Sequence, residues 1–208
     1  MSTHAEGAPK WDARYSESER IWSGEPNALL VSEVVELTPG TALDVGCGEG
    51  ADALWLAERG WQVTAVDVSG VAVERGREAG KRAGLAVDWR VQDITELRGS
   101  FDLVSAFYPV LRKDATVVDA DAGTDLLAHV LSLVAPGGTL LFVHHLDVDR
   151  ECALSHGFDP VALVSPGDVR AALGDAWQVL RDEAVECHVT SGAGAHHTRD
   201  GIVRAIRL

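Results

Sequence analysis

The sequence predicts an α/β fold: a doubly wound sheet that is mostly parallel and ends in an antiparallel hairpin of strands. Three observations support this. Short apolar runs alternate with helical patterns from Thr41 to His145, and such alternation requires parallel strands joined by right-handed crossovers. A glycine-rich turn follows the first apolar run. Two strand-like runs, 177–190 and 202–208, are separated by a short connection, which is typical of a hairpin.

Size and charge limit the class of protein and of partner. The 208 residues, 46% of them hydrophobic, predict one globular domain over residues 1–208. Eighteen basic and thirty-two acidic residues give a net charge of −14. Binding to nucleic acid or to an anionic membrane surface depends on Lys and Arg. We therefore expect a small-molecule substrate, no nucleic-acid partner and no membrane partner.

The chain shows no apolar run long enough to cross a bilayer, and its first residues lack the basic and apolar regions of a signal peptide. These features predict a cytoplasmic protein. Cys47, Cys152 and Cys187 are odd in number and scattered, so no disulfide framework and no metal site are expected.

The N-terminal residues 1–26 divide into a tail of ten residues and an aromatic, charged segment. Trp11, Tyr15 and Trp22 are spaced so that several could share one helical face. Two interpretations fit this segment: a short helix that packs on the domain, or a lid that closes over a bound ligand.

The next segments form a strand–helix–strand unit of the nucleotide-binding kind. Asn27 is a plausible N-cap for a helix that stops before Pro39, and the stretch 41–67 then contains an apolar run, a glycine turn, a helix and a second apolar run that ends in an acid. The glycine turn permits positive φ and close approach of a ligand to the backbone. The following helix turns its unpaired N–H groups toward the same place. Asp67 ends the second run, where it can accept both hydroxyl hydrogens of a ribose.

The remaining elements continue the alternation. Helices are predicted over 69–84 and 126–134, and strands over 86–91, 101–109 and 139–145, with an acidic linker at 114–125. The residues from Leu146 to Gly174 are less regular, with a short helix at 168–173.

The acid before the glycine turn distinguishes between ligands. The turn has the spacing Gly-x-Gly-x-Gly, contributed by Gly46, Gly48 and Gly50, where dinucleotide folds usually carry Gly-x-Gly-x-x-Gly. Asp44 precedes it, and a carboxylate beside a diphosphate is repelled. A ligand with a cationic group suits this acid better.

The run Leu43-Asp44-Val45-Gly46-Cys47-Gly48-Glu49-Gly50 resembles the first motif of the class I S-adenosylmethionine-dependent methyltransferases. The Pro136-Gly137-Gly138 turn is a further signature of that family. The resemblance covers residues 41–145, is closest to bacterial small-molecule methyltransferases of the tellurite-resistance or thiopurine type, and implies a Rossmann-like fold with S-adenosyl-L-methionine as cofactor. The ligand carries an ammonium, a carboxylate and a sulfonium.

The resemblance also implies roles for individual residues. Asp93 and Ile94 would contact the adenine, Ser105, Ala106 and Phe107 the methionine part, and Tyr108 would face the transferable methyl. The expected cofactor-binding residues are Trp22, Asp44, Gly46, Gly48, Gly50, Asp67, Val68, Asp93, Ile94, Ala106 and Phe107. For Asp93, a turn or N-cap aspartate is the alternative interpretation.

Catalytic and substrate-binding candidates lie later in the chain. His144 and His145 end a strand at the crevice, and strand alternation sends at most one of them into the pocket. We take Tyr108 and His145 as candidate catalytic residues, with His145 able to accept a proton. His196, His197 and Arg199, on the final hairpin loop, are candidates for substrate binding.

The predicted activity is methyl transfer to an oxygen, sulfur or nitrogen atom of a small molecule. A non-catalytic S-adenosylmethionine binder that regulates a partner would have the same binding motifs. An NAD-dependent oxidoreductase is opposed by Asp44, by the glycine spacing and by the terminal hairpin. Methylation of DNA bases is opposed by charge and by the run Ala106-Phe107-Tyr108-Pro109, which lacks the polar residue and Pro-Pro pair of those enzymes.

Overall fold

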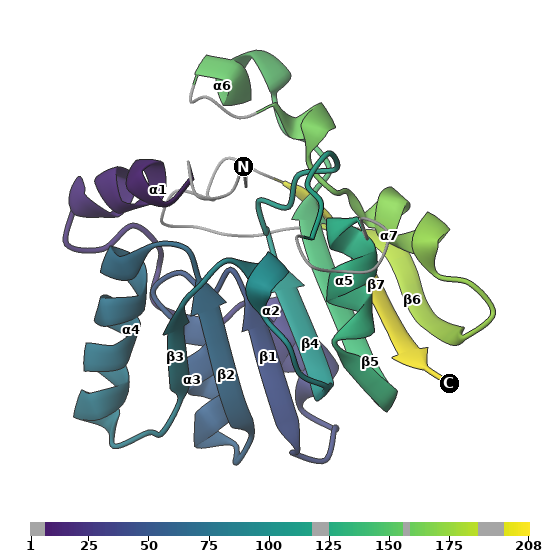
Figure 1. Ribbon diagram of the computed structural model, residues 1–208, viewed down its shortest axis with the longest axis horizontal. Coiled ribbons are helices and arrows are strands. Elements are labelled where there is room, and N and C mark those ends of the chain that lie inside the picture. Colours follow the sequence, from purple (N-terminus) through teal and green to yellow (C-terminus); the bar gives the residue numbers. More distant parts are fainter. Residues whose placement is uncertain (1–6, 118–124, 156–158, 187–197) are drawn as a thin grey trace.

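A computed structural model describes residues 7–117, 125–155, 159–186 and 198–208. Its centre is a seven-stranded sheet in the order β3-β2-β1-β4-β5-β7-β6 (Figure 1). The strands are β1 Thr41–Val45, β2 Gln62–Asp67, β3 Asp88–Val91, β4 Phe101–Phe107, β5 Val134–His145, β6 Trp177–Glu186 and β7 Arg199–Arg207. Neighbouring strands pair in parallel except that β7 is antiparallel to both β5 and β6. The predicted fold class is therefore confirmed.

Helices cover both faces of the sheet (Figure 1). They are α1 Gly7–Ser16, α2 Ala28–Val34, α3 Ala51–Glu58, α4 Gly70–Ala83, α5 Leu126–Ser132, α6 Arg150–Ser155 and α7 Pro166–Ala172, with short 3₁₀ turns at Ile94–Glu96 and Pro160–Ala162. Within the described ranges, no helix combines the length and apolarity needed to span a bilayer.

The two sides of the sheet form two separate apolar clusters. Along β1, Ala42 packs with residues of α2 and α3, whereas Leu43 and Val45 pack with residues of α5 and α7. Successive side chains of a strand point to opposite faces, so a strand buried on both sides needs an unbroken apolar run. This explains why β1, β2 and β4 are nearly continuous in Ala, Val, Leu and Phe.

Capping and one aromatic wedge fix α3 and α4. The Ser69 hydroxyl accepts from the Ala72 N–H at 3.2 Å, and Gly84 ends α4 in the left-handed region, as predicted. The indole of Trp89 occupies the space where a Cβ of Gly50 or Gly76 would lie, 2.2 and 2.6 Å from the nearest ring atom. A glycine at the N-cap of α3 and one inside α4 thus let one indole fill the groove between the two helices.

Several predicted boundaries were wrong; the strand predicted over 101–109, for example, ends at Phe107. The Pro136-Gly137-Gly138 turn lies inside β5, which begins at Val134. The pairing of β4 with β5 is irregular there. Phe101 pairs with Val134 and Leu103 pairs with Thr139, so a step of two residues along β4 matches a step from Val134 to Thr139 along β5. In the terminal hairpin, β6 ends at Glu186 and β7 begins at Arg199, so the paired strands are offset from the predicted 177–190 and 202–208.

Candidate active site

The carboxyl ends of the parallel strands meet at one edge of the sheet. The strand order reverses between β1 and β4, and ligands of open α/β sheets bind beyond the strand ends at such a switch point. The ends of β1, β2, β3 and β4 carry the expected cofactor-binding residues Asp44, Gly46, Gly48, Gly50, Asp67, Val68, Asp93, Ile94, Ala106 and Phe107. The fold therefore brings these candidate residues to one edge of the sheet.

The three glycines of the turn have different surroundings. All have positive φ, 70° at Gly46, 52° at Gly48 and 83° at Gly50, as predicted. A Cβ on Gly48 would lie 2.8 Å from the Tyr15 Oη, and one on Gly50 would collide with Trp89. A Cβ on Gly46 meets no described atom within 4 Å. Gly46 is thus the glycine that faces open space, where a ligand can approach the backbone.

Asp44 is a buried acid with an unused acceptor. The residue is 3% exposed, and its Oδ2 has no hydrogen-bond partner within the described part of the chain. Burial raises the pKa of this carboxyl well above its usual value, and Asp52 and Asp67 raise the pKa further, whereas a hydrogen bond from the Ala53 amide lowers it. A buried carboxylate is stable only with a counter-charge. The position suits an ammonium group and repels a phosphate.

Asp67 fixes the glycine turn and still has acceptor capacity. Its Oδ2 accepts from the Gly48 N–H and its Oδ1 from the Ser69 N–H, both at 2.9 Å. Burial raises the pKa of this half-buried carboxyl, and the backbone hydrogen bonds oppose that shift. Each carboxylate oxygen has two lone pairs, so Asp67 can hold the turn and accept from a ribose at the same time.

Asp93 acts as the turn residue of the alternative interpretation. It caps the 3₁₀ turn Ile94–Glu96, and its Oδ1 accepts from the Thr95 amide at 2.9 Å and the Thr95 hydroxyl at 2.8 Å. Ile94 is buried in the core. The cap places the carboxylate at the end of β3, so the two interpretations are compatible.

The end of β4 is more buried than expected. Ser105 is fully buried and its hydroxyl lies 3.2 Å from the Leu43 carbonyl oxygen, to which it donates. The hydroxyl therefore serves the sheet, and contact of Ser105 with the methionine part stays a prediction. Ala106 and Phe107 also pack in the core clusters, so their side chains belong to the core.

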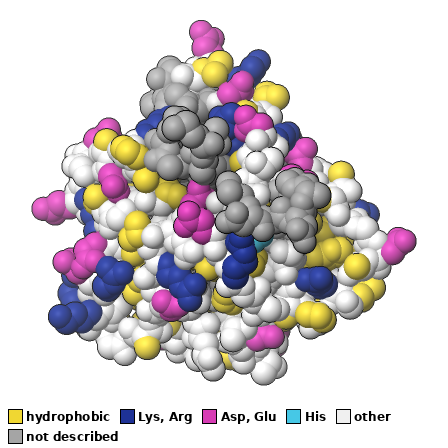
Figure 2. Space-filling view, in the orientation of Figure 1, with side chains coloured by type: hydrophobic (Ala, Val, Ile, Leu, Met, Phe, Trp, Pro, Cys, Tyr) yellow, Lys and Arg dark blue, Asp and Glu magenta, His cyan; other side chains and the backbone are white. Residues whose placement is uncertain are grey.

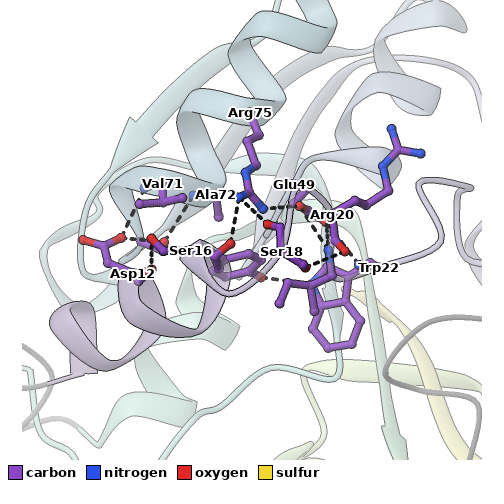
Figure 3. A network of polar contacts seen from close by, with 12 residues as sticks. Asp12, Ser16, Ser18, Arg20, Trp22, Glu49, Val71, Ala72 and Arg75 are labelled. Carbon is purple, nitrogen blue, oxygen red and sulfur yellow. Dashed lines mark hydrogen bonds and ion pairs between the residues drawn. The ribbon is translucent and has the colours of Figure 1, made fainter.

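The segment 7–26 lies over the glycine turn, and Glu49 of that turn is its main anchor (Figure 3). The Glu49 carboxylate accepts from the backbone N–H groups of Ile21 at 3.2 Å and Trp22 at 3.1 Å. Arg75 of α4 forms an ion pair with Glu49 at 2.9 Å and donates to the carbonyls of Tyr15 and Ser18, each at 2.7 Å. The segment is thus bound to α4 through the turn itself.

Tyr15 and Trp22 reach the turn from this segment. Tyr15 is 4% exposed and accepts from the Trp22 Nε1–H at 3.0 Å, and its Oη is the atom against Gly48. Burial raises the pKa of Tyr15, and Asp67 raises it further, so the phenol stays neutral. Trp22 also lies beside the turn, with its Nε1 3.5 Å from the position of a Cβ on Gly48. The role of Tyr15 was missed, although its spacing from Trp22 placed both on the same segment.

A second cluster joins β4, β5 and β7. Asp200, 1% exposed, accepts from the Tyr108 hydroxyl at 2.9 Å, and its other carboxylate oxygen lies 2.8 Å from the His145 Nδ1. The rings of Tyr108 and His145 stack with centroids 4.1 Å apart. The structure therefore brings the two predicted catalytic residues together. Asp200 was missed, although an acid that precedes the apolar run of a strand was an available signal.

The two adjacent histidines differ as strand alternation predicts. His144 is not in this cluster, and its ring lies 6.5 Å from the ring of Phe142. Burial lowers the pKa of His144 to about 4, with a further lowering from His145, so His144 is neutral near pH 7.

The remaining candidates have weaker structural support. Arg199 is the first residue of β7 and not part of the hairpin loop, whereas His196 and His197 lie outside the described residues. Cys47 is buried, and burial raises the pKa of its thiol, which disfavours a nucleophilic role. Over the ranges that the structure describes, three or more His, Cys, Asp or Glu side chains do not gather to hold a metal ion.

Comparison with known proteins agrees with this geometry. Residues 42–138 match the family model described as a methyltransferase domain. The chain is 33% identical over 128 residues to ribosomal RNA small subunit methyltransferase C of Alcanivorax borkumensis, which covers 61% of this chain and 39% of the relative. It is 34% identical over 114 residues to the ubiquinone biosynthesis O-methyltransferase of Xanthomonas euvesicatoria, covering 53% and 45%. The chain thus spans less than half the length of these curated relatives.

Among solved structures, magnesium protoporphyrin IX methyltransferase of Synechocystis PCC 6803 with bound SAH has the same fold. Its TM-score is 0.62 at 19% identity, over 98% of this chain and 95% of that one. Several observations point to the same family: the strand order with an antiparallel β7, the Gly-x-Gly-x-Gly turn, the acid before that turn, and the matched domain. Residues 42–138 therefore match a methyltransferase domain, and the comparisons support the class I S-adenosylmethionine-dependent methyltransferase superfamily.

Proposed function

We propose that the protein binds S-adenosyl-L-methionine and transfers its methyl group to a small-molecule acceptor. The observation that carries the proposal is the buried, unpartnered Oδ2 of Asp44 beside a turn whose Gly46 faces open space. An ammonium group satisfies such a carboxylate, whereas the phosphates of a dinucleotide would be repelled.

The other residues of the crevice complete the cofactor site in this proposal. Asp67 accepts from the ribose hydroxyls, and Asp93 and Ile94 border the adenine. Val68, Ala106 and Phe107 line the crevice, the last two through their backbone. Tyr15 and Trp22 cover the glycine turn from the N-terminal segment.

Methyl transfer depends on alignment of the acceptor and on exclusion of water more than on covalent catalysis. The bound cofactor supplies an electrophilic methyl group on a sulfonium. The chain aligns the acceptor by holding it beyond the ends of β4 and β5, and alignment of this kind lowers barriers strongly. The segment 7–26, anchored on Glu49, acts as a lid that excludes water from the turn.

A small molecule fits the acceptor role better than nucleic acid. One relative is named for ubiquinone biosynthesis and one for ribosomal RNA, so relatives of both kinds exist. The net charge of −14 opposes binding to phosphate backbones. In Figure 2, basic and acidic side chains are interspersed on the face shown.

Two measurements test the proposal. Calorimetry with S-adenosylhomocysteine and with NAD should show binding of the first and not of the second; the reverse result would contradict the cofactor assignment. Release of S-adenosylhomocysteine is then measured against phenols, thiols, amines and oxyanions. Turnover with at least one class is expected, whereas binding without turnover on a broad panel would favour a regulatory binder.

A further inference from the structure

The cluster of Tyr108, His145 and Asp200 has the build of a proton-transfer site. Asp200 lies directly opposite His145 in the β5–β7 ladder, so the backbone pairing alone already joins these strands. An apolar residue would serve the sheet at this buried position. A carboxylate there is stable only because both of its oxygens are hydrogen bonded, one to each ring.

Tyr108 shows that the local backbone is shaped around this cluster. Its φ of 51° is the only positive value at a non-glycine residue within the described ranges. For a bulky residue this conformation is strained, and it persists only where the surroundings hold it. The Tyr108 amide donates to the Val143 carbonyl at 2.8 Å, and the ring stacks on His145. Such strain is concentrated at functional sites.

The geometry also fixes the chemistry of His145. An ionised carboxylate only accepts hydrogen bonds, so the 2.8 Å contact between Asp200 and the His145 Nδ1 places the hydrogen on Nδ1. The lone pair that can take a proton is then on Nε2. A carboxylate that holds an imidazole in this tautomer supports a general base.

We propose that His145 is the general base for a hydroxyl acceptor of the phenol class, and that Asp200 is the positioning residue that fixes its tautomer. This inference rests on the proposed methyltransferase function. The acceptor oxygen gives its proton to His145 Nε2 and forms a bond to the methyl carbon. That carbon's bond to sulfur breaks, and its electron pair goes to sulfur. The imidazolium then releases the proton to solvent.

Reference pKa values favour a phenol over other acceptors. A thiol, at about 8.5, is partly ionised near neutral pH and needs little help from a base, whereas a phenol at about 10 stays protonated but is within reach of an imidazole. The rings of Tyr108 and His145 stack at the strand ends. Flat aromatic acceptors suit stacking on such rings.

The test compares Asp200→Asn with Asp175→Asn, a matched change at an exposed position before β6. Turnover is measured with catechol, whose hydroxyls are protonated at the assay pH, and with 4-nitrophenol, which is largely ionised in mildly alkaline buffer. We expect D200N to lower kcat for catechol by about 100-fold or more with little change in KM for S-adenosylmethionine. The loss with 4-nitrophenol should be much smaller, and D175N should match the wild type.

A second measurement needs no acceptor. Nitrogen NMR of the wild-type protein should show the His145 hydrogen on Nδ1, and D200N should shift it toward Nε2, while retained S-adenosylhomocysteine binding shows that the variant is folded. A wild-type hydrogen on Nε2, or equal loss of kcat for both phenols, overturns the inference. A protein that binds S-adenosylhomocysteine but methylates only thiols overturns the hydroxyl acceptor alone. A protein that binds none overturns the proposed function as well.

Discussion

Asp44 is held 3% exposed at the end of β1 by the fold around it. Its carboxyl has a raised pKa because burial and two neighbouring acids disfavour the charged form. In the ligand-free protein, burial of the ionised carboxylate would lower stability, so the folded state keeps a proton at pH values where the unfolded state has released it. The free energy of unfolding therefore falls as pH rises through the raised pKa.

Asp44→Asn should separate binding from stability. Loss of a charged hydrogen bond of about 1.5–3 kcal/mol predicts at least tenfold weaker S-adenosylhomocysteine binding, whereas the thermal midpoint of the free protein should rise and its pH dependence flatten. Calorimetry and thermal melts between pH 5 and 8 check both. Unchanged affinity would show that the ammonium lies elsewhere.

Asp67→Ala should weaken cofactor binding by more than about 1 kcal/mol, or roughly fivefold, through two lost ribose hydrogen bonds. Because Asp67 also holds the Gly48 and Ser69 amides, some loss of order in the turn should accompany it. Asp88→Ala, at the exposed start of β3, is the control. Equal affinities of the two variants by calorimetry would remove Asp67 from the site.

At the scale of elements, substitutions at the cap glycines of α3 and α4 test how tightly Trp89 packs between the two helices. Gly50→Ala combines left-handed backbone strain with a Cβ 2.2 Å from the Trp89 ring, whereas Gly84→Ala has the strain and no neighbour within 4 Å. We expect the second to lose about 1 kcal/mol and the first at least 2 kcal/mol more. Urea unfolding measures both, and similar losses would mean that Trp89 moves aside without cost.

The N-terminal segment provides a second element-scale prediction. Arg75→Ala removes the link between α4, Glu49 and the carbonyls of residues 15 and 18. Amide exchange over residues 7–26 should become faster, and S-adenosylhomocysteine binding should weaken by about 1 kcal/mol. Arg77→Ala, on an exposed face of the same helix, should change neither. Unaltered exchange in R75A would show that other contacts hold the segment.

At the scale of the whole molecule, the charge of −14 should keep ribosomal RNA away. In a mobility-shift assay at low salt, about 50 mM, where phosphate contacts are strongest, we expect no complex with a small-subunit RNA fragment while S-adenosylhomocysteine still binds. A complex that weakens steeply with added salt would favour the nucleic-acid acceptor.

The same scale explains what could be read from the sequence. Asp44, Asp67 and the glycine turn were predictable because each lies within a few residues of a strand end, in a local pattern. Tyr15 and Asp200 were missed because their roles depend on contacts between distant segments. Tyr108 and Asp200 are 92 residues apart, and no local periodicity records such a meeting.

Ser105 shows a different limit of prediction from sequence, because here a residue was assigned to the ligand and not missed. It was placed at the ligand because strand position alone does not show which way a small polar side chain bonds. The carbonyl of Leu43 on the neighbouring strand takes its hydrogen. Strand alternation predicted different surroundings for His144 and His145, and it also places Phe142 on the same face as His144. Only the three-dimensional packing shows that Asp200 of β7 meets His145.

The position of β7 between β5 and β6 has a consequence for synthesis. In chain order β6 is made first, yet it pairs only with β7, so during translation it emerges without a partner. The edge of β5 that pairs with β7 is also unpaired at that stage. The contact of Asp200 with His145 cannot form until β7 has left the ribosome tunnel. Nascent chains halted before residue 199 should thus depend on chaperones and be unable to position His145, however well the cofactor half has folded.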